Sequence, residues 1–387
     1  MSSDLEVTIL MPCLNEADTL ETCVRKAVKA LADAGINGEV VVADNGSTDG
    51  SPEIATRTGA RVVPVTRKGY GNALRGGIEA ARGKFIIMGD ADDSYDFLEA
   101  GKFVAKLREG FELVQGCRLP AGGGQVLAGA MPFSHRWLGN PMFSRMARRM
   151  FAAPIHDVYC GLRGFTKDLY QRLDLRCEGM EFATEMIIKA SLQRARIAEV
   201  PITLHPDGRK AHAPHLRTVR DGWRTLRFFL VFSPRWLFLL PGCTLGILGL
   251  AGYAVAMPGL KIGGVTFDAH TLLFSTLAIL LGYQSVLFAL LAKTFAINEG
   301  LLPKDPHLDR FFQTMYLERG LLLGTVTLLA GLALLGVAVA RWWAVHFGPL
   351  DYAQTMRWVI PGVMLTALGF QTILSSFFVS ILSLKKR

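Results

Sequence analysis

Charged residues are scarce in this sequence. Only 19% of its 387 residues are Asp, Glu, Lys or Arg, whereas about 25% is usual for a soluble domain. Half of the chain is hydrophobic and its mean hydropathy is +0.30, which excludes an intrinsically disordered chain. The low charge also argues against a single soluble domain. It indicates an ordinary soluble part joined to a lipid-soluble part.

Several sequence motifs are also missing. The six cysteines include no CxxC pair and no zinc-like spacing, which predicts free thiols in a reducing compartment. No basic segment precedes the first apolar run, so we expect no signal peptide and a cytoplasmic N-terminal part. The chain lacks the GxxxxGK(S/T) motif of P-loop proteins and the GxSxG motif of α/β-hydrolases. The glycines at 69–77 lack the GxGxxG spacing, which excludes a dinucleotide-dependent dehydrogenase.

Four long stretches without Asp, Glu, Lys or Arg lie in the C-terminal part. They cover residues 236–258, 269–292, 320–340 and 358–384. Each is long enough to cross a bilayer, which takes ~20 residues. Lys and Arg are more frequent in alternate loops, so both termini and the segment 293–319 are expected on the cytoplasmic side. We expect that segment to be amphipathic and to lie along the membrane.

The positive charge is concentrated before the first predicted span. The chain has a formal net charge of +9, and residues 205–235 hold seven Lys or Arg against two Asp. The helical spacing of Arg217, Arg220, Arg224 and Arg227 indicates a basic helix on an anionic membrane surface. A soluble helix with a solvated Arg face is the alternative. The predicted organisation is a cytoplasmic domain (1–208), a basic juxtamembrane helix (209–235) and a transmembrane domain (236–387).

Short apolar runs alternate with helical patterns in the first hundred residues. Strands are predicted at 6–11, 39–43, 61–65 and 85–88, with helices at 17–34 and 69–82. This alternation predicts an α/β domain with a mostly parallel sheet covered by helices. Ligands bind at the carboxyl ends of such strands. Polar residues follow three of the predicted strands, so we expect a functional site there.

The fourth predicted strand runs into the turn Asp90-Ala91-Asp92. Carboxylates crowded in one turn are costly unless a cation neutralises them, and oxygen ligands of this type suit Mg²⁺ or Mn²⁺. An ordinary acidic turn or helix cap is the alternative. The second strand runs into Asp44, whose carboxylate can accept a hydrogen bond from a nucleotide base or ribose, besides forming a turn.

Four motifs together resemble those of family 2 glycosyltransferases: Pro12-Cys13-Leu14-Asn15-Glu16, Asp44-Asn45-Gly46-Ser47-Thr48-Asp49-Gly50, Lys68-Gly69-Tyr70-Gly71 and Asp90-Ala91-Asp92. The later runs at 157–165 and 181–186 are similar to the branch that makes polyprenyl-phosphate sugars, such as dolichol-phosphate mannose synthases and undecaprenyl-phosphate glucosyltransferases. The resemblance covers about residues 5–235. It implies a GT-A-like domain that binds a nucleotide sugar.

The resemblance also implies roles for individual residues. The nucleotide sugar would contact Pro12, Leu14, Asn15, Glu16, Asp44, Asn45, Lys68, Gly69, Asp90, Ala91, Asp92 and Arg118. Asp90 and Asp92 would bind the metal, and Asp92 and Asp157 would be catalytic, Asp157 as a base or acceptor-site carboxylate. The acceptor phosphate would contact Arg136, Arg163, Arg209 and Lys210. Where several dolichol-type members have a metal-binding Gln, this chain has Ser94, and Asp93 is the candidate third ligand.

Local alternatives stand beside these assignments. Asp157 would otherwise cap a helix or pair with Arg163. Glu181 and Glu185 would form a solvated helix face. Arg136 and the arginines at 145, 148 and 149 would be membrane-surface charge rather than site residues.

These features predict metal-dependent, inverting transfer of a hexose from a UDP-glucose or GDP-mannose type of donor to polyprenyl phosphate, at the cytoplasmic face of the inner membrane. The alternatives are a family 2 enzyme with another lipid or glycan acceptor, or a non-catalytic nucleotide-sugar-binding scaffold. Neither Arg136-Trp137 nor Arg235-Trp236 has the upstream Gln of the QxxRW signature of processive synthases. A nucleic-acid partner is not expected, because the basic residues lie beside the spans. The glycines of the third span are compatible with helix packing in a homo-oligomer.

Overall fold

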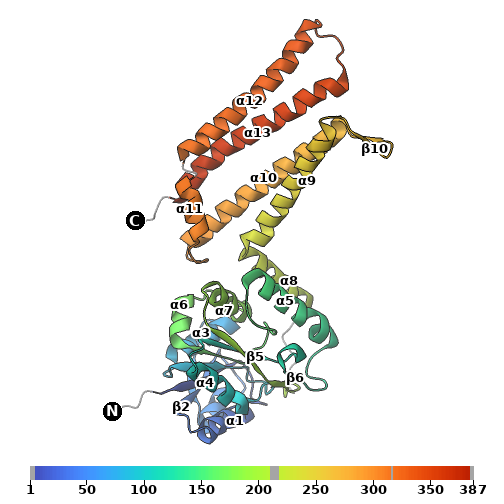
Figure 1. The fold of residues 1–387 in the computed structure, drawn as a ribbon. Coiled ribbons are helices and arrows are strands. Elements are labelled where there is room, and N and C mark those ends of the chain that lie inside the picture. Colours follow the sequence, from blue (N-terminus) through green and yellow to red (C-terminus); the bar gives the residue numbers. More distant parts are fainter. Residues whose placement is uncertain (1–4, 210–217, 315–316, 384–387) are drawn as a thin grey trace. The chain divides into compact units, whose positions relative to one another are not determined.

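The computed structural model describes residues 5–209, 218–314 and 317–383. It divides into two compact units, Met1–Phe229 and Leu230–Arg387 (Figure 1). The first unit is a layered α/β domain, and the second consists mainly of long helices.

A seven-stranded sheet forms the centre of the first unit. The strand order is β3-β2-β1-β4-β7-β5-β8, and of these strands only β7 runs antiparallel to its neighbours. The strands are β1 (Val7–Cys13), β2 (Gly38–Asp44), β3 (Arg61–Pro64), β4 (Phe85–Met88), β5 (Leu113–Cys117), β7 (Arg163–Thr166) and β8 (Ile197–Pro201). The short strands β6 (Gln125–Val126) and β9 (Thr203–Leu204) pair separately.

Helices cover both faces of this sheet, which explains why its central strands are continuous apolar runs. Every residue of β1 and β4 is buried. Ile9 belongs to the same core cluster as Val24 and Phe103. On the opposite face Gly77 lets a helix approach closely, since an added Cβ would lie 2.4 Å from a Leu10 methyl carbon. The helices of this unit are α1 (Leu20–Asp33), α2 (Ser51–Arg57), α3 (Tyr70–Ala80), α4 (Ala100–Arg108), α5 (Asn140–Phe151), α6 (Lys167–Leu173), α7 (Glu181–Leu192) and α8 (Thr218–Val231), which ends just past it.

The mostly parallel α/β sheet is confirmed, and the four predicted strands are present within two residues at either end. The antiparallel insertion of β7 between β4 and β5 was not predicted. Because β7 is antiparallel to both neighbours, the carboxyl ends of β4 and β5 lie at the same edge of the sheet. That edge therefore collects the turns that follow β1, β2, β4 and β5.

Among its described residues, the second unit contains four helices that are long and apolar enough to cross a membrane, as the sequence predicted. They cover Arg235–Ala256, Ala269–Asn298, Leu317–Ala344 and Tyr352–Leu382. The corresponding elements are η4 (Arg235–Leu239) with α9 (Leu240–Ala256), α10 (Ala269–Asn298), α12 (Leu317–Ala344) and α13 (Tyr352–Ser383). The short helix α11 (Pro306–Thr314) occupies part of the segment predicted to be amphipathic, and a small hairpin of β10 (Lys261–Ile262) and β11 (Val265–Thr266) joins α9 to α10.

These helices lie side by side in two pairs, α9 with α10 and α12 with α13 (Figure 1), and glycines lie where the paired helices meet. A Cβ added at Gly331 of α12 would lie 2.4 Å from the Thr366 backbone nitrogen of α13. A Cβ added at Gly249 of α9 would lie 2.7 Å from the Ser275 carbonyl oxygen of α10. In contrast, no described atom lies within 4 Å of a Cβ added at Gly336. The small residues of the third span are thus used mainly for packing within the chain.

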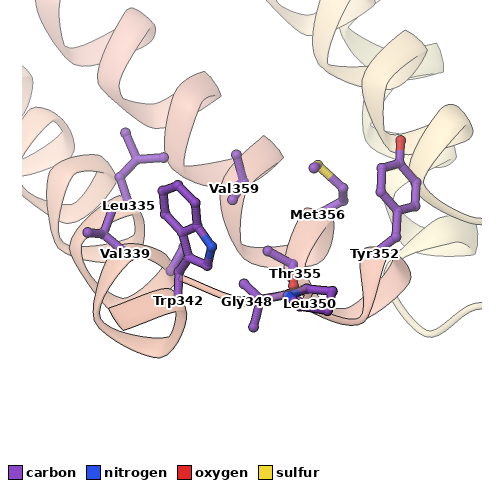
Figure 2. A pocket seen from close by; sticks show the side chains of 11 residues that line it. Leu335, Val339, Trp342, Gly348, Leu350, Tyr352, Thr355, Met356 and Val359 are labelled. Carbon is purple, nitrogen blue, oxygen red and sulfur yellow. The ribbon is translucent and has the colours of Figure 1, made fainter. Parts of the chain in front are cut away.

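A cavity of about 610 Å³ lies between α12 and α13, next to the loop that joins them (Figure 2). Its lining includes Leu335, Val339 and Trp342 from α12 and Tyr352 and Met356 from α13. Trp and Tyr are enriched at membrane interfaces. The lining contains no carboxylate and no basic side chain. The acidic turn at 90–92 lies in the α/β domain.

Candidate active site

Asp90 directly follows β4 and is fixed by a tyrosine. The Tyr70 hydroxyl donates a hydrogen bond of 2.8 Å to Asp90 Oδ1. Burial, followed by the nearby Asp92 charge, raises the pKa of Asp90 to about 6. Two carboxylates that disfavour each other's ionisation in this way are suited to bind a divalent cation, because the positive charge would remove the repulsion between them. The described residues contain no cluster of three or more His, Cys, Asp or Glu suited to a metal. Water and donor phosphates would therefore have to supply further ligands, as is usual for Mg²⁺.

Asp92 is held from both of its oxygen atoms. Oδ1 accepts hydrogen bonds from the Ser94 backbone N–H at 3.1 Å and from the Ser94 hydroxyl at 2.6 Å. Oδ2 accepts from Arg209 at 3.1 Å. Ser94 thus orients Asp92. The neighbouring Asp93 pairs with Lys26 of α1 at 2.8 Å, so its carboxylate is engaged with that helix and the structure does not support it as the third ligand.

Hydrogen bonds join the loops that follow β1 and β2. The Asn15 N–H donates to the Ser47 hydroxyl at 2.9 Å, and Asn15 Oδ1 accepts from the Thr48 N–H at 2.8 Å. Asn15 has a φ of +59°, which Asn tolerates better than most residues. Asp44 closes a tight turn by accepting from the N–H groups of Gly46 and Ser47 at 3.1 Å each. Pro12 lies inside β1, and Leu14 is 42% exposed.

The third motif is attached to the same loop. Lys68 Nζ donates to the Asn45 carbonyl at 2.6 Å, and the Gly69 N–H donates to Asn45 Oδ1 at 2.8 Å. Gly69 has a φ of +127°, and an added Cβ there would lie 2.6 Å from the Glu178 carbonyl. A larger residue would therefore be strained at this position. Apart from Arg118, the residues predicted to bind the donor thus lie at the carboxyl ends of β1 and β2 or on the loops after β1, β2, β3 and β4.

Arg118 and Asp157 form an ion pair inside the domain. Arg118 follows β5, and its Nε lies 2.7 Å from Asp157 Oδ2. Asp157 is fully buried and Arg118 is 8% exposed. Tyr95, three residues after Asp92, lies beside this pair: its hydroxyl is 3.4 Å from Arg118 Nη1 and accepts from the Gly161 N–H at 2.8 Å. The alternative pairing of Asp157 with Arg163 is wrong.

Arg163, expected at the acceptor phosphate, is instead part of the interior. It is fully buried, and its terminal nitrogens donate to the carbonyl oxygens of Ala183 and Cys160 at 2.6 Å each. Burial lowers its pKa. These contacts give it a structural position, which corrects the expectation. Glu185 is also buried and pairs with Lys189 at 2.8 Å, so it does not belong to a solvated face.

Arg209 lies among three carboxylates. It donates to Asp207, to Glu16 Oε1 at 3.3 Å and to Asp92 Oδ2 at 3.1 Å. The sequence predicted contact with an acceptor phosphate, whereas the structure places its guanidinium beside the acidic turn. Arg136 stacks over the Trp137 ring at 5.3 Å on the short helix η3 (His135–Gly139). Lys210 lies outside the described residues.

Glu199 of β8 was not singled out by sequence reasoning. Its Oε1 accepts from the N–H groups of His156 at 2.6 Å and Asp157 at 3.1 Å, and its Oε2 lies 2.7 Å from His156 Nδ1. Glu199 thus positions the segment that carries Asp157. No local sequence signal marks it, because the contact spans 42 residues. Tyr70, which orients Asp90, was also not predicted, although it belongs to the motif Lys68-Gly69-Tyr70-Gly71.

Exposed apolar side chains lie just before and within η3. Phe133, Trp137 and Leu138 are 78%, 57% and 68% exposed. On its buried side α5 packs on α8, where the rings of Phe143 and Phe229 meet edge to face at 6.1 Å. Exposed aromatic and aliphatic side chains near basic residues are typical of a surface that contacts a membrane.

A QxxRW match does occur at residues 354–358, in α13, and the sequence reasoning overlooked it. There Arg357 donates to Asp268 at 3.1 Å, and Trp358 lies 4.8 Å beneath Arg341. These contacts lie within the helical unit.

An α/β domain with two carboxylates after a parallel strand, joined to long apolar helices, fits the class of membrane-attached glycosyltransferases that the sequence motifs resemble. Comparison with known families agrees. Residues 8–174 match the glycosyl transferase family 2 model, and residues 290–383 match the glycosyltransferase family 2 C-terminal transmembrane region. The chain belongs to glycosyltransferase family 2.

Relatives with assigned names include two from Haloferax volcanii. The low-salt glycan biosynthesis hexosyltransferase Agl6 is 36% identical over 97% of this chain and 90% of its own length. A dolichyl-phosphate hexose transferase is 30% identical over 51% of this chain and 82% of its own length. Among solved structures, glucosyl-3-phosphoglycerate synthase from Mycobacterium tuberculosis is 21% identical with a TM-score of 0.44, over 59% of this chain and 78% of that protein.

Proposed function

We propose that this glycosyltransferase transfers a hexose from a nucleotide sugar to polyprenyl phosphate at the cytoplasmic face of a membrane, with inversion at the anomeric carbon. The observation that carries the proposal is the acidic turn at 90–92, because β4, which precedes it, lies in the sheet between β1 and β2 on one side and β5, which leads to the Arg118–Asp157 pair, on the other. The relative named as a dolichyl-phosphate hexose transferase supports a lipid-phosphate acceptor.

The donor would occupy the loops after β1, β2 and β4. Asp44 and Asn15 would orient the base and ribose, since both lie on loops that hydrogen bonds already fix. Asp90 and Asp92 would hold Mg²⁺ or Mn²⁺, which neutralises charge on the departing diphosphate. Tyr70 and Ser94 keep the two carboxylates in place without needing to move during the reaction.

The acceptor needs little deprotonation, because a phosphate monoester is already anionic near pH 7. Its oxygen attacks the anomeric carbon opposite the diphosphate, the carbon–oxygen bond to the diphosphate breaks, and the electron pair leaves with the diphosphate. Positioning and charge therefore contribute more than general-base catalysis. Asp157 would act by orienting Arg118 towards the phosphates. The exposed surface around Trp137 would hold the domain at the membrane.

The test is a transfer assay with the full-length protein in nanodiscs that contain polyprenyl phosphate. With Mn²⁺ and a panel of UDP- and GDP-sugars, one donor should support hexose transfer. Asp90→Asn and Asp92→Asn should each lower the rate about 100-fold. The matched control is Asp96→Asn on the same loop, where the Asp96 side chain caps the turn Phe97–Glu99. Binding of donors without any turnover would favour the scaffold alternative and contradict the proposal.

A further inference from the structure

Arg209 contacts the oxygen of Asp92 that a metal would need. Asp92 Oδ1 already accepts two hydrogen bonds from Ser94, whereas Oδ2 accepts from Arg209 Nη2 at 3.1 Å. The same guanidinium reaches Glu16 Oε1 at 3.3 Å. The Arg209 side chain is only 12% exposed. A guanidinium stays protonated, so it neutralises this site until another cation displaces it.

The segment around Arg209 lies against the acidic turn through its backbone as well. The Gly208 N–H donates to the Asp92 carbonyl at 3.0 Å, and the His205 N–H donates to the Ser94 carbonyl at 2.9 Å. Asp207 binds the Arg209 Nε with both carboxylate oxygens, at 2.9 Å each. Residues 205–209 are therefore a strap (the term used below) across the acidic turn, on the path of the chain towards α8.

We propose that Arg209 is a built-in counter-cation that competes with the divalent metal for Asp92, so that metal binding loosens the strap and turns Arg209 towards an incoming phosphate. Two cations cannot share Asp92 Oδ2 without strong repulsion. When the metal displaces Arg209 from Asp92, Arg209 stays paired with Asp207. Its remaining N–H groups can then donate hydrogen bonds to an anion. The donor and its metal then bind before the acceptor. This inference rests on the metal-dependent part of the proposed function.

The first measurement is Mn²⁺ affinity of the full-length protein in nanodiscs, without nucleotide, by electron paramagnetic resonance. Arg209→Gln should bind Mn²⁺ about tenfold more tightly, since the competing state is removed, and Arg209→Lys should lie between. Lys26→Gln is the matched control, because Lys26 pairs with Asp93 on the same turn at 2.8 Å. It should stay within twofold of wild type. Equal affinities in wild type and Arg209→Gln would overturn the inference.

The second measurement is amide hydrogen exchange of the strap. It separates competition between Arg209 and Mn²⁺ for Asp92 from the mere loss of one positive charge in the Arg209→Gln variant. In wild type, saturating Mn²⁺ should speed exchange of the His205 and Gly208 amides, which donate to the acidic turn, because linkage is reciprocal. In Arg209→Gln the exchange should be fast with or without Mn²⁺. Mn²⁺ binding with unchanged exchange in wild type would overturn the inference and leave the proposed function standing. No Mn²⁺ binding in any variant would overturn both.

Discussion

Arg118 and Asp157 are joined by two parallel hydrogen bonds inside the α/β domain, with Nε 2.7 Å from Oδ2 and Nη2 2.9 Å from Oδ1. The Arg118 backbone N–H donates to the same carboxylate at 3.1 Å. Asp157 therefore fixes both the backbone and the guanidinium of the residue that follows β5. Two parallel hydrogen bonds of this kind fix the orientation of the guanidinium, in addition to the attraction between the charges.

Replacing Asp157 should damage both folding and transfer. Asp157→Asn leaves the Arg118 charge buried without a full counter-charge, which we expect to cost about 3–5 kcal/mol of stability. Transfer should fall more than tenfold, measured at a temperature where circular dichroism shows the variant folded. Glu109→Gln, which breaks the exposed pair with Lys106, is the control and should change neither property. Transfer by Asp157→Asn within twofold of wild type would show that the assigned role is wrong.

Removing one hydroxyl should test how Asp90 is oriented. Tyr70→Phe deletes the donor that lies 2.8 Å from Asp90 Oδ1. We expect the donor-sugar KM to rise about tenfold or more, because a hydrogen bond to a charged group contributes about 1.5–3 kcal/mol. Tyr170→Phe on α6 is the control substitution. An unchanged KM in steady-state assays would mean that Tyr70 does not position Asp90 for the donor.

The acid stability of the α/β domain should depend on Glu112. Burial acts to raise the pKa of Glu112, but hydrogen bonds from the Arg196 N–H and the Arg172 guanidinium outweigh it and hold the pKa below its ordinary value near 4.5. A lowered folded-state pKa adds stability above the ordinary value, and this is lost as the pH falls through the folded value.

Glu112→Gln should therefore reduce the free energy of unfolding by about 1 kcal/mol at pH 7. The difference from wild type should disappear once the pH lies below the folded-state pKa. Urea titrations followed by circular dichroism at several pH values measure this. A difference that stayed constant down to the acid limit would contradict the pairing as its source.

Two glycines of α12 offer a matched test of the helical unit. Gly331→Ala places a methyl group where Thr366 N is 2.4 Å away, whereas Gly336→Ala meets no described atom within 4 Å. Gly331→Ala should lower the thermal unfolding temperature in detergent by several degrees, since small residues let membrane helices approach. Gly336→Ala should leave it unchanged or slightly higher. Equal effects would argue against the α12–α13 packing.

The fold was largely predictable because its signals are local. The strand Phe85–Met88 is an apolar run bounded by polar turns, and the four spans are long uncharged stretches. The position of β7 was not predictable in the same way. Its neighbours β4 and β5 are set by long-range pairing, such as Met88 with Arg163. No pattern of period two reveals which strand will be inserted between others.

The sequence motifs predicted which residues belong to the site, but not which side chains they contact. Asp90 and Asp92 stood out because they follow a strand, but their partners did not. Arg209 lies 117 residues from Asp92 in the sequence, and 42 Lys or Arg residues were available as partners. Arg163 was assigned to a phosphate from its motif, yet its side chain is buried. Burial and ion pairing depend on tertiary packing, which a motif does not encode.

The most direct test of the central claim is the chemical identity of the product. Full-length protein in nanodiscs would receive its nucleotide sugar with Mn²⁺ and equal amounts of polyprenyl phosphate, polyprenol and diacylglycerol, and the lipids would be analysed by mass spectrometry and NMR. The account predicts one hexose linked to polyprenyl phosphate, with the anomeric configuration inverted from that of the donor. A hexose found only on polyprenol or diacylglycerol, or one that retains the donor configuration, would contradict it.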